Sequence, residues 1–381
     1  MSKKEQIRSA RNVASTLDRR QFLGSGAALG VGMGAVVAGL GRDVVAQNAP
    51  APAAAPGGPG ARPAPPPQPT VSQPPQLKDL KGKVAYITAA SDGIGLGIAR
   101  ACSNAGMKVV IGYRNEERLK AALPLFKDGN AGVLAIKHDV TDRDGWKSLL
   151  EQINSKFGNL HLVVNNAGVK TLRQASQAKF EEWDNAVAVN FTAIHNSVAT
   201  CLPHMLKHGE GGHFVTTASM GGLLPGVNAG VYTSTKIAAV GIMEALRVEL
   251  ESTTVGTSVF CPGLVSTDNY PMGEENPFRA AQMARAGVPA RAPTPPVGMD
   301  PLEAGERVLN GVVNNDLFIL THPEFKPGIQ ERFDAIMAST PAVETPIPQA
   351  RIAYERVVLS CGIYPREIAH RSQKRKSYRS V

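Results

Sequence analysis

Short apolar runs alternate with helix-like stretches from residue 83 onward. The runs are apolar throughout, which is typical of strands that are buried on both faces of a parallel sheet. The expected strands are residues 83–88, 108–113, 132–137, 161–166, 213–219, 257–263 and 317–321. The expected helices are residues 94–105, 116–126 with a break near Pro124, 142–157, 180–207 and 231–251. This alternation predicts an α/β fold, a doubly wound Rossmann-type three-layer sandwich with a parallel sheet of about seven strands in a single domain.

The front of the chain has a different pattern. Two arginines, Arg19 and Arg20, precede an uncharged run that contains six glycines before it ends at Leu40. Glycine lowers apolarity and helix propensity, so this run suits an export signal better than a stable membrane span. The segment DRRQFL at residues 18–23 resembles the twin-arginine signal of bacteria. We expect residues 1–46 to be a twin-arginine signal segment and the protein to be periplasmic, with an uncleaved membrane tether as the alternative.

Proline and alanine dominate the next segment, because residues 49–76 hold eleven of the 28 prolines of the chain. Such a composition cannot bury a core and forms an extended spacer. We therefore expect a disordered linker at residues 47–78 and a catalytic domain at residues 79–330. A C-terminal extension with a basic tail is expected at residues 331–381, with that tail disordered or at the surface.

The net charge of +9 lies in the two ends of the chain. Residues 1–46 carry +4, residues 351–381 carry +6, and the remaining 304 residues carry −1. A folded core with this balance offers no basic face for a polyanion, which argues against a nucleic-acid partner.

Metal binding is not expected from the cysteines or histidines. The four cysteines form no CxxC pair, which argues against a zinc site or a redox dithiol. His204, His208 and His213 lie near one another in the sequence with Glu210, but the stretch LKHGEGG is typical of an exposed helix end and turn.

A glycine-rich turn, TAASDGIGLG at residues 88–97, follows the first expected strand and opens the first helix. Backbone N–H groups at such a helix start point outward, and the helix dipole favours negative charge there. The context of strand, turn and helix therefore predicts a dinucleotide pyrophosphate site.

A second motif, YTSTK, places Tyr232 and Lys236 four residues apart, on one face of an expected helix. An ammonium group and the positive charge of a cofactor both stabilise phenolate, so we expect the pKa of Tyr232 to be lowered toward neutrality. Ser219 comes at the end of an expected strand, where ligands bind in such sheets. Together these side chains predict proton transfer at a carbinol or carbonyl oxygen.

These motifs, with NNAG at residues 165–168, HDV at 138–140 and PG at 262–263, resemble those of the short-chain dehydrogenases/reductases. The resemblance is close over about residues 81–270. It implies four catalytic residues: Tyr232 as general acid/base, Lys236 on the nicotinamide ribose, Ser219 on the substrate oxygen and Asn190 holding a water in the proton relay. The cofactor contacts that it implies are Thr88, Ser91, Asp92, Gly93, Ile94, Gly95, Arg114, Asp139, Val140, Asn166, Ala167, Gly168, Tyr232, Lys236, Pro262, Gly263, Val265 and Thr267.

Two positions bear on the cofactor. Ala89 replaces the first glycine of the family's turn, so the turn is expected to be slightly altered. Tyr113 stands where an NAD-binding acid is expected, and Arg114 follows it, which favours NADP because a guanidinium binds a 2′-phosphate bidentately. Asp92 is an argument against NADP, so NAD is the alternative.

We therefore expect an NAD(P)-dependent oxidoreductase that interconverts a secondary alcohol and a ketone or aldehyde. A non-catalytic nucleotide-binding sensor or scaffold and a lyase or epimerase on the same fold are the alternatives. Residues 266–300 are expected to be a lid, and the family commonly forms homodimers or homotetramers through the helices that hold Asn190 and Tyr232. An apolar substrate pocket is expected from Leu223, Leu224, Val227, Met272, Phe278 and Met283, while Lys170 and Arg173 are either an acidic-substrate contact or a solvated loop.

Overall fold

The computed structural model describes residues 73–126, 132–267, 298–341, 348–359, 362–373 and 375–380. The expected signal segment, most of the expected linker and most of the expected lid, including Met272, Phe278 and Met283, lie outside these residues. No helix within the described ranges is long and apolar enough to cross a membrane.

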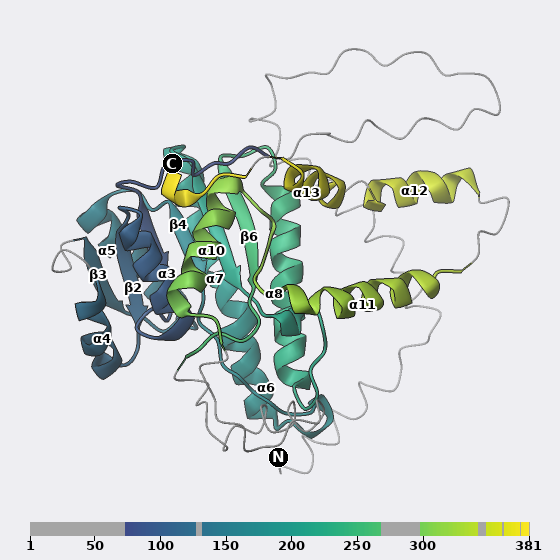
Figure 1. Ribbon diagram of the computed structural model, residues 1–381, viewed down its shortest axis with the longest axis horizontal. Helices are drawn as coiled ribbons and strands as arrows, with labels where there is room; N and C mark the ends of the chain where they lie inside the picture. Colours follow the sequence, from purple (N-terminus) through teal and green to yellow (C-terminus); the bar gives the residue numbers. More distant parts are fainter. Residues whose placement is uncertain are drawn as a thin grey trace, which may run out of the picture. The chain divides into compact units, whose positions relative to one another are not determined.

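Seven parallel strands form the central sheet, in the order β3-β2-β1-β4-β5-β6-β7 (Figure 1). The strands are β1 (Val84–Ile87), β2 (Lys108–Tyr113), β3 (Val133–Lys137), β4 (Leu162–Asn165), β5 (Gly212–Thr217), β6 (Val255–Cys261) and β7 (Phe318–Leu320). This confirms the predicted Rossmann-type α/β fold. The strand order reverses between β1 and β4, and a crevice for a ligand forms at such a switch point, beyond the carboxyl ends of the strands.

Helices cover both faces of the sheet (Figure 1). The α-helices of the described residues are α3 (Gly93–Asn104), α4 (Glu116–Ala122), α5 (Arg143–Phe157), α6 (Phe180–Val187), α7 (Ala193–His208), α8 (Gly230–Glu249), α10 (Pro301–Asn314), α11 (Lys326–Ala338), α12 (Gln349–Leu359) and α13 (Ile363–Arg371), of which α11 and α12 extend away from the sheet (Figure 1). The expected break near Pro124 is present, because a 3-10 turn (Leu123–Leu125) follows α4. The expected single helix at 180–207 is instead divided by a π-helical turn, η4 (Ala188–Thr192).

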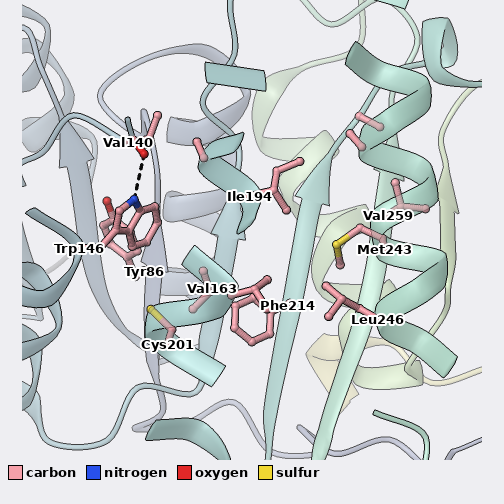
Figure 2. Packing of buried hydrophobic residues seen from close by; sticks show 14 of the residues in the cluster. Tyr86, Val140, Trp146, Val163, Ile194, Cys201, Phe214, Met243, Leu246 and Val259 are labelled. Atoms are coloured by element: carbon pink, nitrogen blue, oxygen red, sulfur yellow. Dashed lines mark hydrogen bonds between the residues drawn. The ribbon is translucent and has the colours of Figure 1, made fainter. Parts of the chain in front are cut away.

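The inner strands β1, β2, β4, β5 and β6 bury side chains on both faces, which is why they are largely apolar, while the edge strands β3 and β7 are only partly buried. On one face, Trp146 of α5 and Met243 of α8 join a cluster with Tyr86 and Phe214 of the sheet (Figure 2). Trp146 Nε1 donates a hydrogen bond of 3.0 Å to the carbonyl of Val140. On the other face, residues of α3 and α10 pack on alternate positions of the same strands.

The helices α3 and α10 approach each other closely at two glycines. A Cβ on Gly97 would lie 1.8 Å from the carbonyl oxygen of Pro301, and one on Gly305 would lie 2.4 Å from the carbonyl oxygen of Gly97. Neither position can hold a larger residue without moving a helix. This contact fixes α3, whose first turn is the expected pyrophosphate site.

The fold begins earlier than the composition indicated. Gln73 and Leu77 are buried, although residues 73–78 were expected to belong to the linker. The Gln73 side-chain amide donates to the carbonyls of Leu250 at 2.9 Å and Val255 at 3.1 Å. These contacts join the segment before β1 to the start of β6.

Residues 362–373 and 375–380 pack on the fold, and we call them the C-terminal clasp. Its arginines pair with acidic groups of the core: Arg366 with Glu251, Arg371 and Arg375 with Asp316, and Arg379 with Glu306. The ring of Tyr378 is buried against the core as well. Most other residues of the clasp lie at the surface, which is one of the two expected alternatives for the tail, and ion pairs with residues far away in the sequence attach them.

Candidate active site

The glycine-rich turn has the shape that a pyrophosphate site requires. Gly93 at the start of α3 has φ +54°, and a Cβ on Gly95 would lie 2.4 Å from the carbonyl oxygen of Ala89. Ala89 adopts φ 51° despite its methyl group. An alanine in this left-handed conformation costs about 1 kcal/mol, so the backbone keeps the positive φ at a modest energetic cost.

Thr88 joins the turn to the neighbouring strand β4. Its Oγ1 accepts hydrogen bonds of 2.8 Å from both backbone N–H groups of Asn166 and Ala167. The Asn166 side chain donates back to the carbonyl of Thr88 at 3.2 Å. Thr88 is therefore a buried residue that holds the backbone after β1 and the backbone after β4 together at the switch point.

A cavity of about 650 Å³ opens at this edge of the sheet, within the size range of ligand pockets. The expected site residues that line it are Ser91, Asp92, Gly93, Ile94, Arg114, Val140, Asn166, Ala167, Gly168, Ser219, Tyr232, Lys236, Gly263, Val265 and Thr267. Thr88, Gly95, Asp139, Asn190 and Pro262 are not among the lining residues. The glycine turn at a helix start and the cavity beside it fit a dinucleotide, which the residues of the turn would hold by its phosphates.

Sequence reasoning missed several lining residues, namely Asn115, Arg118, Val169, Val189, Thr217 and Ala218, and it named Tyr113 and His138 without assigning them to the site. Arg118 had a usable signal, since it lies in the first turn and a half of the helix expected directly after the strand that ends at Tyr113. The others depend on how loops meet in space. Lys170, which we had left undecided, also lines the cavity.

Tyr232 and Lys236 lie together on α8, and Ser219 follows β5, so the structure brings the three side chains to one cavity. Lys236 Nζ is 5.7 Å from the centre of the Tyr232 ring and donates a hydrogen bond of 2.8 Å to the carbonyl of Thr217. Ser219 Oγ accepts a hydrogen bond of 3.1 Å from the backbone N–H of Gly221. This hydrogen bond orients Ser219 at the cavity wall.

Burial, more than charge, sets the protonation of this pair in the protein alone. Burial raises the pKa of Tyr232 above its usual value, and a hydrogen bond with Ser219 partly opposes that shift. Burial also lowers the pKa of Lys236 to about 8. The expected lowering of the Tyr232 pKa is therefore not present in the protein by itself, because loss of solvent outweighs the hydrogen bond with Ser219.

Asn190 clamps the loop that follows β4. The π-helical turn sets Asn190 beside Val169, where its Oδ1 accepts from the Val169 N–H at 2.8 Å and its Nδ2 donates to the Val169 carbonyl at 3.0 Å. The same Nδ2 donates to Thr235 Oγ1 at 3.0 Å. Asn190 thus holds the cavity wall in place from α7's side, and its role in a water relay stays a prediction.

Two arginines at the far end of the cavity each face a carboxylate. Arg118 Nη1 is 2.8 Å from Asp92 Oδ2, and Arg114 Nη1 is 3.6 Å from Asp139 Oδ2. Hydrogen bonds from Thr141, and then Arg114, lower the pKa of Asp139. Both ion pairs are near the surface, where such pairs contribute little and exchange partners readily.

The histidine cluster lies apart from this cavity. Ligand atoms of His161, His208 and Glu210 lie within 4.8 Å of one another, which is close enough for a metal ion. However, His161 and His208 use both ring nitrogens in hydrogen bonds, and Lys83 Nζ lies 3.4 Å from Glu210. His213 is buried elsewhere, with Nε2 2.8 Å from Ser258 Oγ. The existing hydrogen bonds and the ammonium group do not favour a cation here.

The described part of the expected apolar pocket does not line the cavity. Leu223 is buried in the core, and Val227 is exposed. Leu224 lies near Gly328 of α11, where an added Cβ would come within 3.2 Å of it. The apolar wall near the catalytic residues comes instead from Val169, Val189 and Val265.

Comparisons with known proteins agree with this geometry. The short chain dehydrogenase family matches residues 83–276, about half of the chain. A Cα-dehydrogenase from a Sphingobium species is 27% identical over 290 residues, which cover 74% of this chain and 94% of that protein. An uncharacterised oxidoreductase of Staphylococcus epidermidis is 32% identical over 215 residues, which cover 56% and 92%.

Solved structures show the same similarity. A putative short-chain dehydrogenase from Novosphingobium aromaticivorans is 30% identical with a TM-score of 0.65, and the match covers 76% of this chain and 99% of that one. A short-chain dehydrogenase/reductase from Burkholderia phymatum, solved in complex with NAD, is 26% identical with a TM-score of 0.60 and coverages of 71% and 99%. The chain belongs to the short-chain dehydrogenase/reductase family.

Proposed function

We propose that the protein is an NAD(P)-dependent dehydrogenase that interconverts a secondary alcohol and a ketone or aldehyde. The observation that carries this proposal is the convergence of Ser219, Tyr232 and Lys236 on the cavity that the glycine-rich turn also lines. A phenol, a hydroxyl and an ammonium group at one cavity wall can together bind a substrate oxygen and move its proton.

The bound nicotinamide would supply or accept the hydride at the substrate carbon. Tyr232 takes the proton of the substrate hydroxyl in oxidation and returns it in reduction. Ser219 hydrogen-bonds the same oxygen and orients it. Lys236, held by the Thr217 carbonyl, places a positive charge beside the phenol and favours phenolate. Val169, Val189 and Val265 give the reacting carbon an apolar wall that excludes water.

For the cofactor, we propose a preference for NADP, with NAD as the alternative. Arg114 and Arg118 both line the cavity after β2, where the ribose of the adenosine half binds in this fold. A 2′-phosphate would compete with Asp139 and Asp92 for these guanidinium groups, and its greater negative charge favours it over a carboxylate. The net preference is modest, because the two carboxylates remain nearby.

The test is a panel of secondary alcohols and ketones with each cofactor, followed at the absorbance of the reduced nicotinamide. Tyr232→Phe should lower kcat by a factor of about 10² to 10⁴, since it removes the acid/base group. The Kd for NADPH should change less than threefold, because the ring remains. Ser234→Ala, at an exposed position on the same helix, serves as the control.

The result that contradicts this proposal is also clear. A wild-type protein that binds NADPH but turns over no member of the panel would favour the sensor or scaffold hypothesis. If Tyr232→Phe kept wild-type turnover, Tyr232 could not be the acid/base group.

We further propose that the protein is exported in the folded state by the twin-arginine route and reaches the periplasm with its nucleotide bound. The DRRQFL segment supports this, because that route carries folded proteins. Periplasmic protein, once denatured, should release close to one nucleotide per chain, measured by chromatography. Replacing Arg19 and Arg20 by lysine should leave the protein in the cytoplasm. Recovery of nucleotide-free protein from the periplasm would contradict the loading step.

A further inference from the structure

Lys170 differs from its basic neighbour Arg173 in where it lies. Both follow the NNAG segment, and either could meet an acidic substrate. Arg173 is not among the cavity-lining residues, and its Nε lies 3.2 Å from Glu182 Oε1. Lys170 lines the same cavity as Ser219, Tyr232 and Lys236, and only part of its side chain remains in contact with solvent.

The backbone that carries Lys170 is held in place. The preceding residue, Val169, is bound through both its N–H and its carbonyl by the buried Asn190 side chain. One residue earlier, a Cβ on Gly168 would lie 3.5 Å from Lys236 Nζ. The backbone at Lys170 is therefore held in place near Lys236. This fixes the point from which the Lys170 side chain enters the cavity.

The charges of the cavity wall are uneven. Among the described lining residues, the cations are Arg114, Arg118, Lys170 and Lys236, and the one carboxylate is Asp92, which faces Arg118. Lys170 and Lys236 thus place two ammonium groups on one cavity. Loss of solvent, and then the charge of Lys236, lower the pKa of Lys170 to about 7. A bound anion would relieve this repulsion between the lysines.

We propose that Lys170 binds a carboxylate of the substrate, so that the substrate class is an alcohol or ketone that carries a carboxylate away from its reacting carbon. This rests on the proposed dehydrogenase function. The carboxylate does not react: it accepts a charge-assisted hydrogen bond from the Lys170 ammonium while hydride and proton leave the carbinol. Val169, Val189 and Val265 would contact the carbon skeleton between the two ends.

The test compares two probe alcohols that differ in charge and little in shape, 4-(1-hydroxyethyl)benzoate and 1-(4-methylphenyl)ethanol. For Lys170→Met, we expect kcat/KM with the benzoate to fall about 10- to 30-fold, mainly through KM, as for the loss of a partly solvated charge pair. With the methyl compound the change should stay below threefold. Lys170→Arg should keep most of the preference for the benzoate, and Lys207→Met, exposed on α7, should change neither substrate.

Equal losses with both alcohols, or a wild-type enzyme without preference for the benzoate, would overturn the inference. If neither alcohol is turned over, the function proposal fails separately, and binding still decides the role of Lys170. In that case the Kd of 4-acetylbenzoate for the protein with NADPH should rise about 10-fold in Lys170→Met, while that of 4-methylacetophenone stays constant. Unchanged Kd values for both ketones would then reject the carboxylate site.

Discussion

At the residue scale, Lys236 shows burial and function acting against each other. The side chain is buried, and this lowers the pKa of its ammonium to about 8. A charged group in such a place destabilises the fold, although the hydrogen bond to the Thr217 carbonyl offsets part of the cost. In the reaction proposed above, this lysine supplies the cation beside the phenol.

The pH dependence of the free energy of unfolding tests whether the burial of Lys236 destabilises the fold. Lys236 titrates near pH 8 in the folded protein and near its usual value of about 10.5 when unfolded, so between these values the unfolded chain binds more protons. The free energy of unfolding should therefore rise with pH in this window. Lys236→Met lacks this rise. Below pH 8 its free energy of unfolding should exceed that of wild type by up to about 3 kcal/mol, and this difference should disappear by about pH 10.5.

The measurement is urea unfolding of both proteins, without nucleotide, at several pH values. The informative quantity is how the difference between the two unfolding free energies changes with pH. The size of the difference at a single pH is less informative, because Lys236→Met also leaves the Thr217 carbonyl without its partner. Parallel profiles for the two proteins would show that Lys236 is not destabilised by its burial.

The same residues show how far a sequence can predict a site. The Tyr232 and Lys236 pair follows from helical spacing alone, and the structure places both at one cavity. The pKa shift of Tyr232 could not be predicted, because it depends on how deeply α8 is buried by the rest of the fold. Leu224 was expected in the pocket for a similar reason: its apolar character was clear, but its neighbour in α11 was not.

At the element scale, the contact between α3 and α10 couples the fold to the cofactor site. Gly97, in the glycine-rich segment, meets Gly305 of α10 with no room for a side chain on either. The sequence did carry a signal for α10, since Asp300 and Pro301 are typical of a helix start and buried apolar residues recur after it. The π-helical turn at Asn190 had no comparable local signal.

Gly305→Ala should separate the two helices. Overpacking of this kind costs about 1 to 3 kcal/mol, seen as a lower urea midpoint. Because the proposed pyrophosphate site lies at the start of α3, the affinity for NADPH should also fall. The matched control is Gly241→Ala on α8, where an added Cβ meets nothing within 4 Å. There the alanine should raise stability by about 0.5 to 1 kcal/mol. Equal effects at the two sites would contradict the close contact.

At the scale of the whole molecule, the sequence predicted the fold class better than it predicted where the folded unit begins and ends. The alternation of apolar strands and helices was enough to predict the seven-stranded sheet, because the apolar residues of a strand indicate that it is buried. The strand order and the ends of the folded unit depend on contacts between distant residues. Gln73 is hydrogen-bonded to Leu250 and Val255, and Arg375 forms an ion pair with Asp316. The composition of these two segments alone therefore does not indicate that they are attached to the fold.

The C-terminal clasp has a consequence for proteolysis. Its arginines supply counter-charges to Glu251, Glu306 and Asp316, and Tyr378 covers part of the core. A chain cut before residue 362 would keep these acids without those counter-charges and expose the surface that Tyr378 covers. Because Asp316 is buried, its charge would then lie in the core unpaired, which is strongly destabilising. A single cut far from the cavity would therefore weaken the whole fold.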